Sequence, residues 1–117
     1  MQFDPMTPIW LQVMKAIETD IVTGRRPPGS KLPGGRDLAL EYTINPNTAA
    51  RVYQELERQG LCETRRGLGT FVTEDGEKIA ELRNELARQA VRQCLSTLRR
   101  LGISREQAVQ MILEEDE

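Results

Sequence analysis

The chain of 117 residues contains no histidine and only two cysteines, Cys62 and Cys94. Metal sites need clusters of cysteine, histidine or carboxylate ligands at short spacings, so we expect no metal ion and no cofactor. The lack of histidine, of paired carboxylates and of an activated nucleophile also argues against an enzyme. We interpret both cysteines as small buried hydrophobic residues, with a redox or metal-sensing role as the alternative.

Long hydrophobic runs are absent as well. No apolar stretch approaches the roughly 18 residues of a membrane span, and the start of the chain does not have the pattern of a signal peptide. Hydrophobic residues make up 38% of the chain and charged residues 29%, as in ordinary soluble proteins. We therefore expect a cytoplasmic protein without a membrane partner, built from one compact domain and a short appendage.

The net charge is only −2, which argues against binding to polyanions through bulk charge alone. The distribution of the charges points the other way. Three stretches, between residues 20 and 37, 41 and 55, and 63 and 74, contain basic residues but no acidic ones. Their basic residues are Arg25, Arg26, Lys31, Arg36, Arg51, Arg65 and Arg66. We expect these stretches to face a phosphate backbone.

A strong helix-start pattern lies in the middle of the chain. Asn45 has the side-chain oxygen of a helix N-cap, and Pro46 suits the first helical position, where no N–H is needed. The helix that follows places Asn47, Thr48 and Arg51 near its start on one side, while its apolar residues turn to a core. This pattern predicts a helix with a polar, exposed front.

A basic β-hairpin is predicted directly after this helix. Two short runs, residues 61–65 and 70–73, flank the turn Gly67-Leu68-Gly69, and Arg65 and Arg66 lie at the end of the first run. A capped helix followed by a basic hairpin is the layout of a winged helix-turn-helix, which binds DNA. We expect the helix-turn-helix over about residues 35–54 and the wing over about residues 61–73.

The remaining helices complete the expected architecture. Helical spacing of apolar residues predicts a helix over about residues 8–22, with Trp10 in its core-facing side, and a short one over about residues 36–42. After a boundary near residue 75, a long helix is expected over about residues 77–101, and a capping box at Ser104 and Gln107 opens a last one. The expected fold class is mainly α: a winged helix-turn-helix over residues 7–75 and a two-helix region over residues 76–117.

The two last helices have wide apolar stripes and no sheet to cover them. Burying roughly 1,000 Å² of apolar surface per chain is worth on the order of 25 kcal/mol before ordering costs. The same pair of helices from a second copy would provide that cover, so we expect a homodimer through residues 76–117. The alternative is a monomer in which the pair folds back on its own winged domain.

Short motifs between about residues 7 and 74 stand in a fixed order and spacing. They are Pro8-Ile9-Trp10-Leu11-Gln12, Pro28-Gly29-Ser30-Lys31-Leu32-Pro33, Arg36-Asp37-Leu38-Ala39, Ile44-Asn45-Pro46-Asn47-Thr48, Tyr53-Gln54-Glu55-Leu56-Glu57, Gly60-Leu61 and Gly67-Leu68-Gly69-Thr70-Phe71-Val72. Together they resemble the GntR family of bacterial transcription regulators, and the Asn-Pro-Asn-Thr motif and the short tail resemble its YtrA subfamily. The resemblance implies a dimeric repressor, often encoded beside the transporter genes that it controls.

The chain departs from the family pattern at four positions. Gly34 replaces the usual serine cap of the second helix, a change that costs only a few tenths of a kcal/mol. Thr43 stands where a turn glycine is common, and Pro46 and Ala50 stand where many relatives have arginine. Base contacts therefore depend more on the polar residues at the start of the recognition helix, and the operator sequence cannot be predicted.

Residue types and resemblance together give a set of expected contacts with double-stranded DNA. The set is Arg36, Asn45, Asn47, Thr48, Arg51, Arg65, Arg66, Gly67 and Thr70. Structural alternatives stay open for several of them: Arg36 could pair with Asp37 or Glu41, Thr48 could cap the helix locally, and glycines could serve the hairpin turn alone. Asn45 is more a cap than a base contact.

A dimer of this kind should bind a palindrome with half-sites about one helical turn, roughly 34 Å, apart. The alternative function is a winged helix that binds another protein without binding DNA, which would require an exposed apolar patch on the recognition helix. Whether the protein binds a small-molecule effector is left undecided, because no residue pattern predicts a binding site for one.

Overall fold

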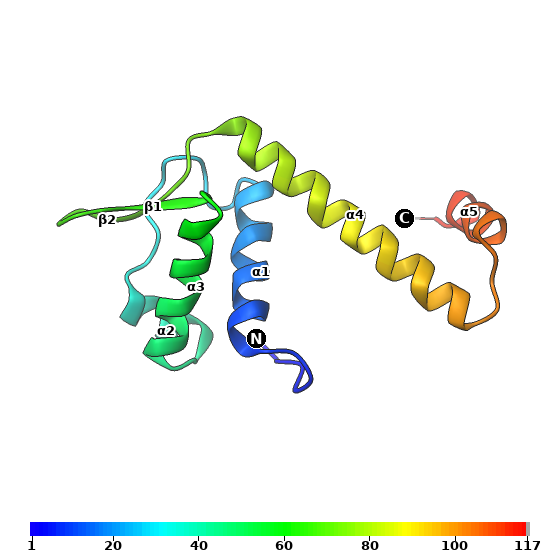
Figure 1. Cartoon of the computed structure of the whole chain (residues 1–117), viewed down its shortest axis with the longest axis horizontal. Coiled ribbons are helices and arrows are strands. Elements are labelled where there is room, and N and C mark those ends of the chain that lie inside the picture. Colours follow the sequence, from blue (N-terminus) through cyan, green and yellow to red (C-terminus); the bar gives the residue numbers. More distant parts are fainter. Residues whose placement is uncertain (117) are drawn as a thin grey trace. The chain divides into compact units, whose positions relative to one another are not determined.

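The computed structural model describes residues 1–116, and the described part is mainly helical with one antiparallel two-stranded sheet, as predicted (Figure 1). It divides into two compact units, the first covering Met1–Arg83 and the second starting at Asn84. The elements are α1 (Ile9–Val22), α2 (Gly35–Tyr42), α3 (Pro46–Arg58), β1 (Cys62–Arg65), β2 (Gly69–Val72), α4 (Gly76–Arg100) and α5 (Arg105–Glu114).

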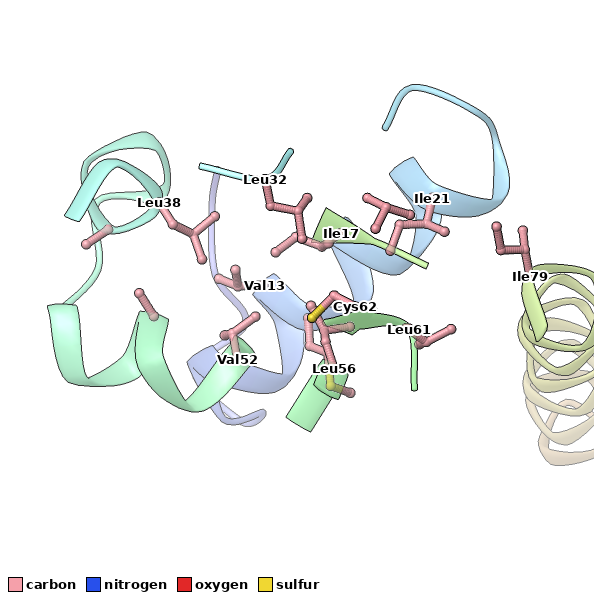
Figure 2. Packing of buried hydrophobic residues seen from close by; sticks show 14 residues of the cluster. Val13, Ile17, Ile21, Leu32, Leu38, Val52, Leu56, Leu61, Cys62 and Ile79 are labelled. Carbon is pink, nitrogen blue, oxygen red and sulfur yellow. The ribbon is translucent and has the colours of Figure 1, made fainter. Parts of the chain in front are cut away.

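The core of the first unit lies between α1, α2, α3 and the hairpin (Figure 2). Helix α1 runs beside α3, and their facing side chains include Val13, Ile17 and Leu56, all fully buried. Leu38 from α2 and Val52 from α3 close the same cluster. Each fully buried aliphatic side chain of this kind contributes roughly 1.5–3 kcal/mol relative to an exposed one. The core therefore fixes α3 against α1 with its opposite side free.

The predicted start of α3 is confirmed. The Asn45 side-chain oxygen accepts a hydrogen bond of 2.7 Å from the backbone N–H of Asn47, and Pro46 occupies the first turn. The cap satisfies one of the backbone donors that every helix start leaves unpaired. The orientation of the first turn of α3 is thus set locally by the sequence.

The turn between α2 and α3 contains the only non-glycine residue among residues 1–116 with a positive φ. Thr43 adopts φ of 55° at the end of α2, and the next residue, Ile44, donates its N–H to Ala39 at 2.9 Å. A β-branched residue is strained in this left-handed conformation, which explains why glycine is the commoner choice there.

The wing is the hairpin of β1 and β2, in which Arg65 lies opposite Gly69. A further segment, residues 29–32, pairs with the other edge of β2 through the hydrogen bonds from Leu32 to Thr70 (2.8 Å) and from Val72 to Ser30 (2.9 Å). The wing is therefore attached to the segment that leads into α2, which fixes its root relative to the helix-turn-helix.

The first turns of α4 belong to the first unit. Ile79 is only 7% exposed and joins the core, Leu82 packs against it, and Arg83 donates a hydrogen bond of 3.0 Å to the carbonyl oxygen of Val22. The compact unit therefore extends about two helical turns beyond residue 75, where the sequence placed the domain boundary.

The second unit consists of the rest of α4 and α5. The predicted capping box is confirmed, since the Ser104 hydroxyl accepts from the N–H of Gln107 at 3.2 Å and the Gln107 side chain accepts from the N–H of Ser104 at 2.8 Å. Across the described residues, no helix combines the length and the apolar character needed to cross a membrane.

Candidate nucleic-acid interface

The exposed side of α3 has the expected polar character. Asn47, Ala50, Arg51 and Gln54 are all exposed, and their spacing of three and four residues puts them on one face of the helix. Thr48 is half-buried beside this face, and its hydroxyl makes no hydrogen bond within residues 1–116. Asn45, not Thr48, therefore caps the helix, since the Asn45 side-chain oxygen accepts the hydrogen bond from Asn47.

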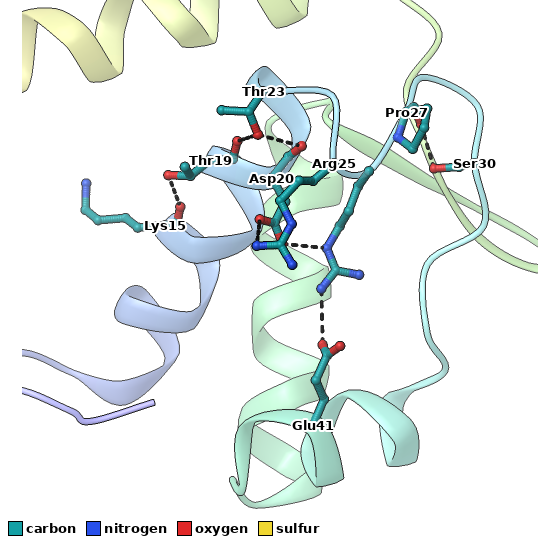
Figure 3. Close-up of polar contacts among 9 residues, drawn as sticks. Lys15, Thr19, Asp20, Thr23, Arg25, Pro27, Ser30 and Glu41 are labelled. Atoms are coloured by element: carbon teal, nitrogen blue, oxygen red, sulfur yellow. Dashed lines mark hydrogen bonds and ion pairs between the residues drawn. The ribbon is translucent and has the colours of Figure 1, made fainter.

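Arg36 is exposed near the start of α2 and has no carboxylate within 4 Å among the described residues. One of its two candidate partners, Glu41, is instead paired with Arg26 (Figure 3 labels Glu41 and Asp20, the two acids that Arg26 binds). The Arg26 guanidinium contacts Asp20 at 3.0 Å and Glu41 at 3.1 Å, and its side chain is only 16% exposed. Arg26 thus links α1 to α2 through two ion pairs, and the expectation that it faces phosphate is wrong.

Two open hollows connect the start of α2 to the start of α3 and to the wing. The first, of about 570 Å³, is lined mainly by apolar groups, together with Arg36 at its rim and Pro46 at the start of α3. The second, of about 680 Å³, lies between the start of α2 and β2 and is lined by Lys31, Asp37 and Thr70 among others. Arg36 therefore lines the first hollow and Lys31 the second, whereas Arg65 and Arg66 of the wing line neither.

The arginines of the wing differ from each other. Arg65 forms an ion pair of 2.7 Å with Glu63, and its guanidinium carbon lies 4.5 Å from the centre of the Phe71 ring. Arg66 is exposed and has no acidic partner within residues 1–116. The Thr70 hydroxyl lies 3.3 Å from that of Thr64 across the hairpin. Arg66 is thus the cation that the wing leaves free.

Gly67 lies at the tip of the hairpin with φ of 77° and has open space around its Cα. The glycine is therefore required by the turn, and no neighbouring group restricts its close approach to a ligand.

Sequence reasoning did not include two exposed polar residues in the candidate set. Lys31 lies across the wing, so that a Cβ built on Gly69 would stand 2.7 Å from the Lys31 Cε. The sequence predicts that the basic stretch containing Lys31 faces phosphate, but only the pairing of residues 29–32 with β2 brings Lys31 to the wing. Gln54, by contrast, follows Asn47 and Ala50 at helical spacing, so helical periodicity alone would have found it.

Tyr53 connects α3 to the segment before α2. Its hydroxyl donates a hydrogen bond to the carbonyl oxygen of Pro33, and burial raises the pKa of Tyr53 above its usual range. The phenol thus stays protonated and can donate at any physiological pH. This contact positions the start of α2, and with it Arg36, relative to the recognition helix.

The two cysteines behave differently. Cys62 is buried as predicted, and burial, with a smaller effect from Glu57, raises the pKa of its thiol to about 12. A thiol that stays protonated is a poor nucleophile and metal ligand. Cys94 is exposed on α4, so the prediction that it is buried is wrong for the single chain. Within the described part of the chain, no group of three or more acidic, cysteine or histidine residues could hold a metal ion.

Comparison with known proteins agrees with this geometry. The family model described as "Bacterial regulatory proteins, gntR family" matches residues 10–72. The HTH-type transcriptional regulator YhcF of Bacillus subtilis (strain 168) is 39% identical to this chain, over 95% of the chain and 92% of YhcF. The HTH-type transcriptional repressor YtrA of the same strain is 34% identical, over 97% of the chain and 89% of YtrA.

Solved structures show the same fold. A GntR family transcriptional regulator from Listeria monocytogenes superposes with a TM-score of 0.88 at 37% identity, over 97% of this chain and all 100% of that one. The DNA-binding domain of AraR in complex with operator ORX1 superposes with a TM-score of 0.58 at 28% identity, over 62% of this chain and 93% of that one. The winged helix-turn-helix, the matched family model and the near full-length relatives together show that the chain belongs to the GntR family of bacterial regulatory proteins.

Proposed function

We propose that the protein is a transcriptional repressor that binds a palindromic operator as a homodimer in the cytoplasm, without catalytic activity. One observation carries this proposal: in a chain of net charge −2, Arg36, Arg51 and Arg66 on the helix-turn-helix and the wing have no acidic partner within residues 1–116. Elsewhere in the same unit, arginines such as Arg26 and Arg58 are paired with carboxylates. Unpaired cations gathered on one motif favour an external anion, and DNA is the ligand that fits a winged helix.

The recognition helix α3 enters the major groove in this proposal. Asn47 and Gln54 have amide groups suited to adenine edges, and Arg51 can donate to guanine or to a phosphate. Thr48 and the free amide of Asn45 supply further donors near the helix start, where phosphates are expected. The apolar face that a protein-binding winged helix would need is not present on the exposed side of α3, where Ala50 is flanked by polar residues.

The start of α2 and the wing hold the DNA backbone and the neighbouring minor groove. Arg36 and Lys31 border the hollow regions next to α2, where phosphates would pass. Arg66 and Gly67 at the wing tip approach the minor groove, in which a guanidinium is favoured when the groove is narrow. Arg65 and Thr70 support the wing and reach the DNA from its strands.

The homodimer forms through residues 76–117. An apolar groove of about 440 Å³ lies between α4 and α5, and its lining includes Val91, Leu95, Val109 and Ile112, with Arg105 as its single charged residue. A second copy offers the same apolar helices, which fit such a groove in a two-fold arrangement. Two recognition helices would then contact half-sites about one helical turn, roughly 34 Å, apart.

Repression follows from occupation of a promoter by the dimer. YtrA, which is similar to the chain over nearly its whole length, is named a repressor, and the DNA-binding domain of AraR has been crystallised on an operator. An effector ligand is not part of the proposal, because the groove of the tail has no convergent polar groups that would recognise one.

The first experiment is selection of bound duplexes from a random DNA pool by the full-length protein at near-physiological salt. The expected result is a palindrome that binds one dimer per site. Weak binding that depends steeply on salt, with no enriched sequence, would contradict the proposal, because it would show only non-specific phosphate contacts.

The second experiment uses two arginines of α3. Arg51→Ala should weaken binding to the selected palindrome by roughly 1–3 kcal/mol, because it removes a contact at the DNA face. Arg58→Ala is the matched control, since Arg58 lies at the other end of the helix and pairs with Glu55 at 2.6 Å. Equal effects of the two substitutions in a fluorescence-anisotropy titration would contradict the role given to Arg51.

A further inference from the structure

Arg51 has an aromatic partner outside the helix-turn-helix. Its guanidinium carbon lies 4.2 Å from the centre of the Trp10 ring, a distance typical of a cation–π contact. Trp10 is the only tryptophan of the chain and lies half-buried at the start of α1, at the edge of the core. The contact therefore joins the front of the recognition helix to the first turn of α1.

Most of the other arginines of the first unit are held by carboxylates, whereas Arg83 donates to the backbone carbonyl of Val22. Arg26 pairs with Asp20 and Glu41, Arg58 with Glu55, and Arg65 with Glu63. Arg51 has no carboxylate partner and no hydrogen bond to a side chain within residues 1–116, so the ring is the contact that orients it.

The two kinds of partner leave an arginine in different states. A carboxylate occupies the N–H donors at the edge of the guanidinium, whereas an aromatic ring contacts its flat face. An arginine stacked on a ring thus keeps its donors and its charge for another ligand. Its long side chain has also lost rotamer freedom before the ligand arrives, so ordering it on binding costs less.

We propose that Trp10 is a positioning residue for DNA binding, which holds the Arg51 guanidinium by its face and leaves its N–H edge directed to the operator. The proposal rests on the DNA contact proposed for Arg51. Trp10 itself needs no contact with DNA, and the ring stays under the guanidinium in the complex.

The competing explanation is that Trp10 serves only the core. A core role predicts that shortening Trp10 weakens binding through stability, to the same degree whether or not Arg51 is present. A positioning role predicts that the effect depends on Arg51. A double-mutant cycle separates the two explanations.

The test compares Trp10→Leu, Trp10→Phe, Arg51→Ala and the Trp10→Leu/Arg51→Ala double variant on the palindrome selected by the full-length protein. Trp10→Leu should weaken binding about three- to fivefold, whereas Trp10→Phe, which keeps an aromatic face, should stay within about twofold. In the Arg51→Ala background, Trp10→Leu should have no further effect. Equal weakening in both backgrounds would overturn the positioning role and leave the proposed function intact.

Trp10 fluorescence provides a test without DNA and does not depend on how well Trp10→Leu folds. Because the chain has a single tryptophan, removal of the stacked guanidinium in Arg51→Ala should change the emission of the free protein. The matched control, Arg58→Ala, should leave the emission unchanged. Identical spectra for wild type and Arg51→Ala would overturn the inference. If Arg51→Ala changes the emission but not DNA binding, the proposed role of Arg51 fails, and the positioning role fails with it.

Discussion

The two units of the chain differ in how many of their large hydrophobic side chains they bury. The first unit buries most of its large aliphatic side chains in a shared core, where Leu56 is 0% exposed, although Leu40 and Leu68 remain on its surface. The second unit leaves such side chains on its surface, with Ile112 61% and Leu113 75% exposed. The first unit therefore has a core of its own, whereas the second exposes the kind of apolar surface that the proposed homodimer would cover.

In the proposed function, this difference separates DNA binding by the first unit from dimerisation by the second. The self-contained unit holds α3 and the wing in a fixed geometry, which a DNA contact requires. In the second unit, the apolar groove between α4 and α5 is not filled by side chains of that unit, so we propose it as the place where a second copy binds. Substitutions that act on one unit and spare the other test this division.

The largest effect is expected from a charge placed in the groove of the tail. Ile112→Glu would put a carboxylate in each half of the proposed interface, at a cost on the order of 5 kcal/mol per dimer. The variant should be a monomer by light scattering at concentrations where the wild type is a dimer. Its affinity for the palindrome should fall more than a hundredfold, while its weak binding to a single half-site should be unchanged.

The matched control for this charge is Gln93→Glu. Gln93 is exposed on α4 and does not line the groove. The substitution adds the same negative charge as Ile112→Glu and hardly changes the shape of the side chain. It should remain dimeric. A dimer that persists in Ile112→Glu would place the interface elsewhere on the chain and would break the comparison between the two units.

A smaller effect is expected when the same truncation is made in each unit. Leu56→Ala removes a fully buried side chain and should lower the free energy of unfolding by about 3 kcal/mol. Leu113→Ala removes an exposed one and should change it by less than about 0.5 kcal/mol. Denaturant unfolding measured in the Ile112→Glu background avoids the contribution of dimerisation. Equal losses for both variants would mean that α5 has a core of its own.

Local patterns account for the parts of the fold that the sequence predicted well. The cap at Asn45 and the capping box at Ser104 involve only neighbouring residues, so their chemistry is visible in the sequence itself. The short helix α2 formed although Gly34 provides no side-chain cap, as expected from the small cost of that exchange.

The features that sequence reasoning missed depend on contacts between distant residues. The ion pair of Arg26 and Glu41 joins residues 15 positions apart and turns a predicted DNA cation inward. Lys31 reaches the wing only because its segment adds to the edge of β2. The exposure of Cys94 was missed for a different reason. Cys94 belongs to the apolar stripe of α4, and such a stripe predicts burial without showing whether the same chain or another one covers it.

The smallest predicted effect concerns the strained turn between α2 and α3. Thr43→Gly should raise the free energy of unfolding of the first unit by about 1 kcal/mol, because glycine adopts a φ of 55° without the steric penalty of a β-branched residue. Thr23→Gly is a comparison of opposite sign: Thr23 also ends a helix, but its φ is −92° and its hydroxyl donates to the carbonyl oxygen of Thr19 at 2.7 Å, so both the glycine and the loss of that bond should lower stability. Thermal unfolding of both variants in the Ile112→Glu background measures the difference. Since Thr43 makes no side-chain hydrogen bond within residues 1–116, operator binding should be unchanged, and a loss of affinity would instead give the strained turn a part in DNA recognition.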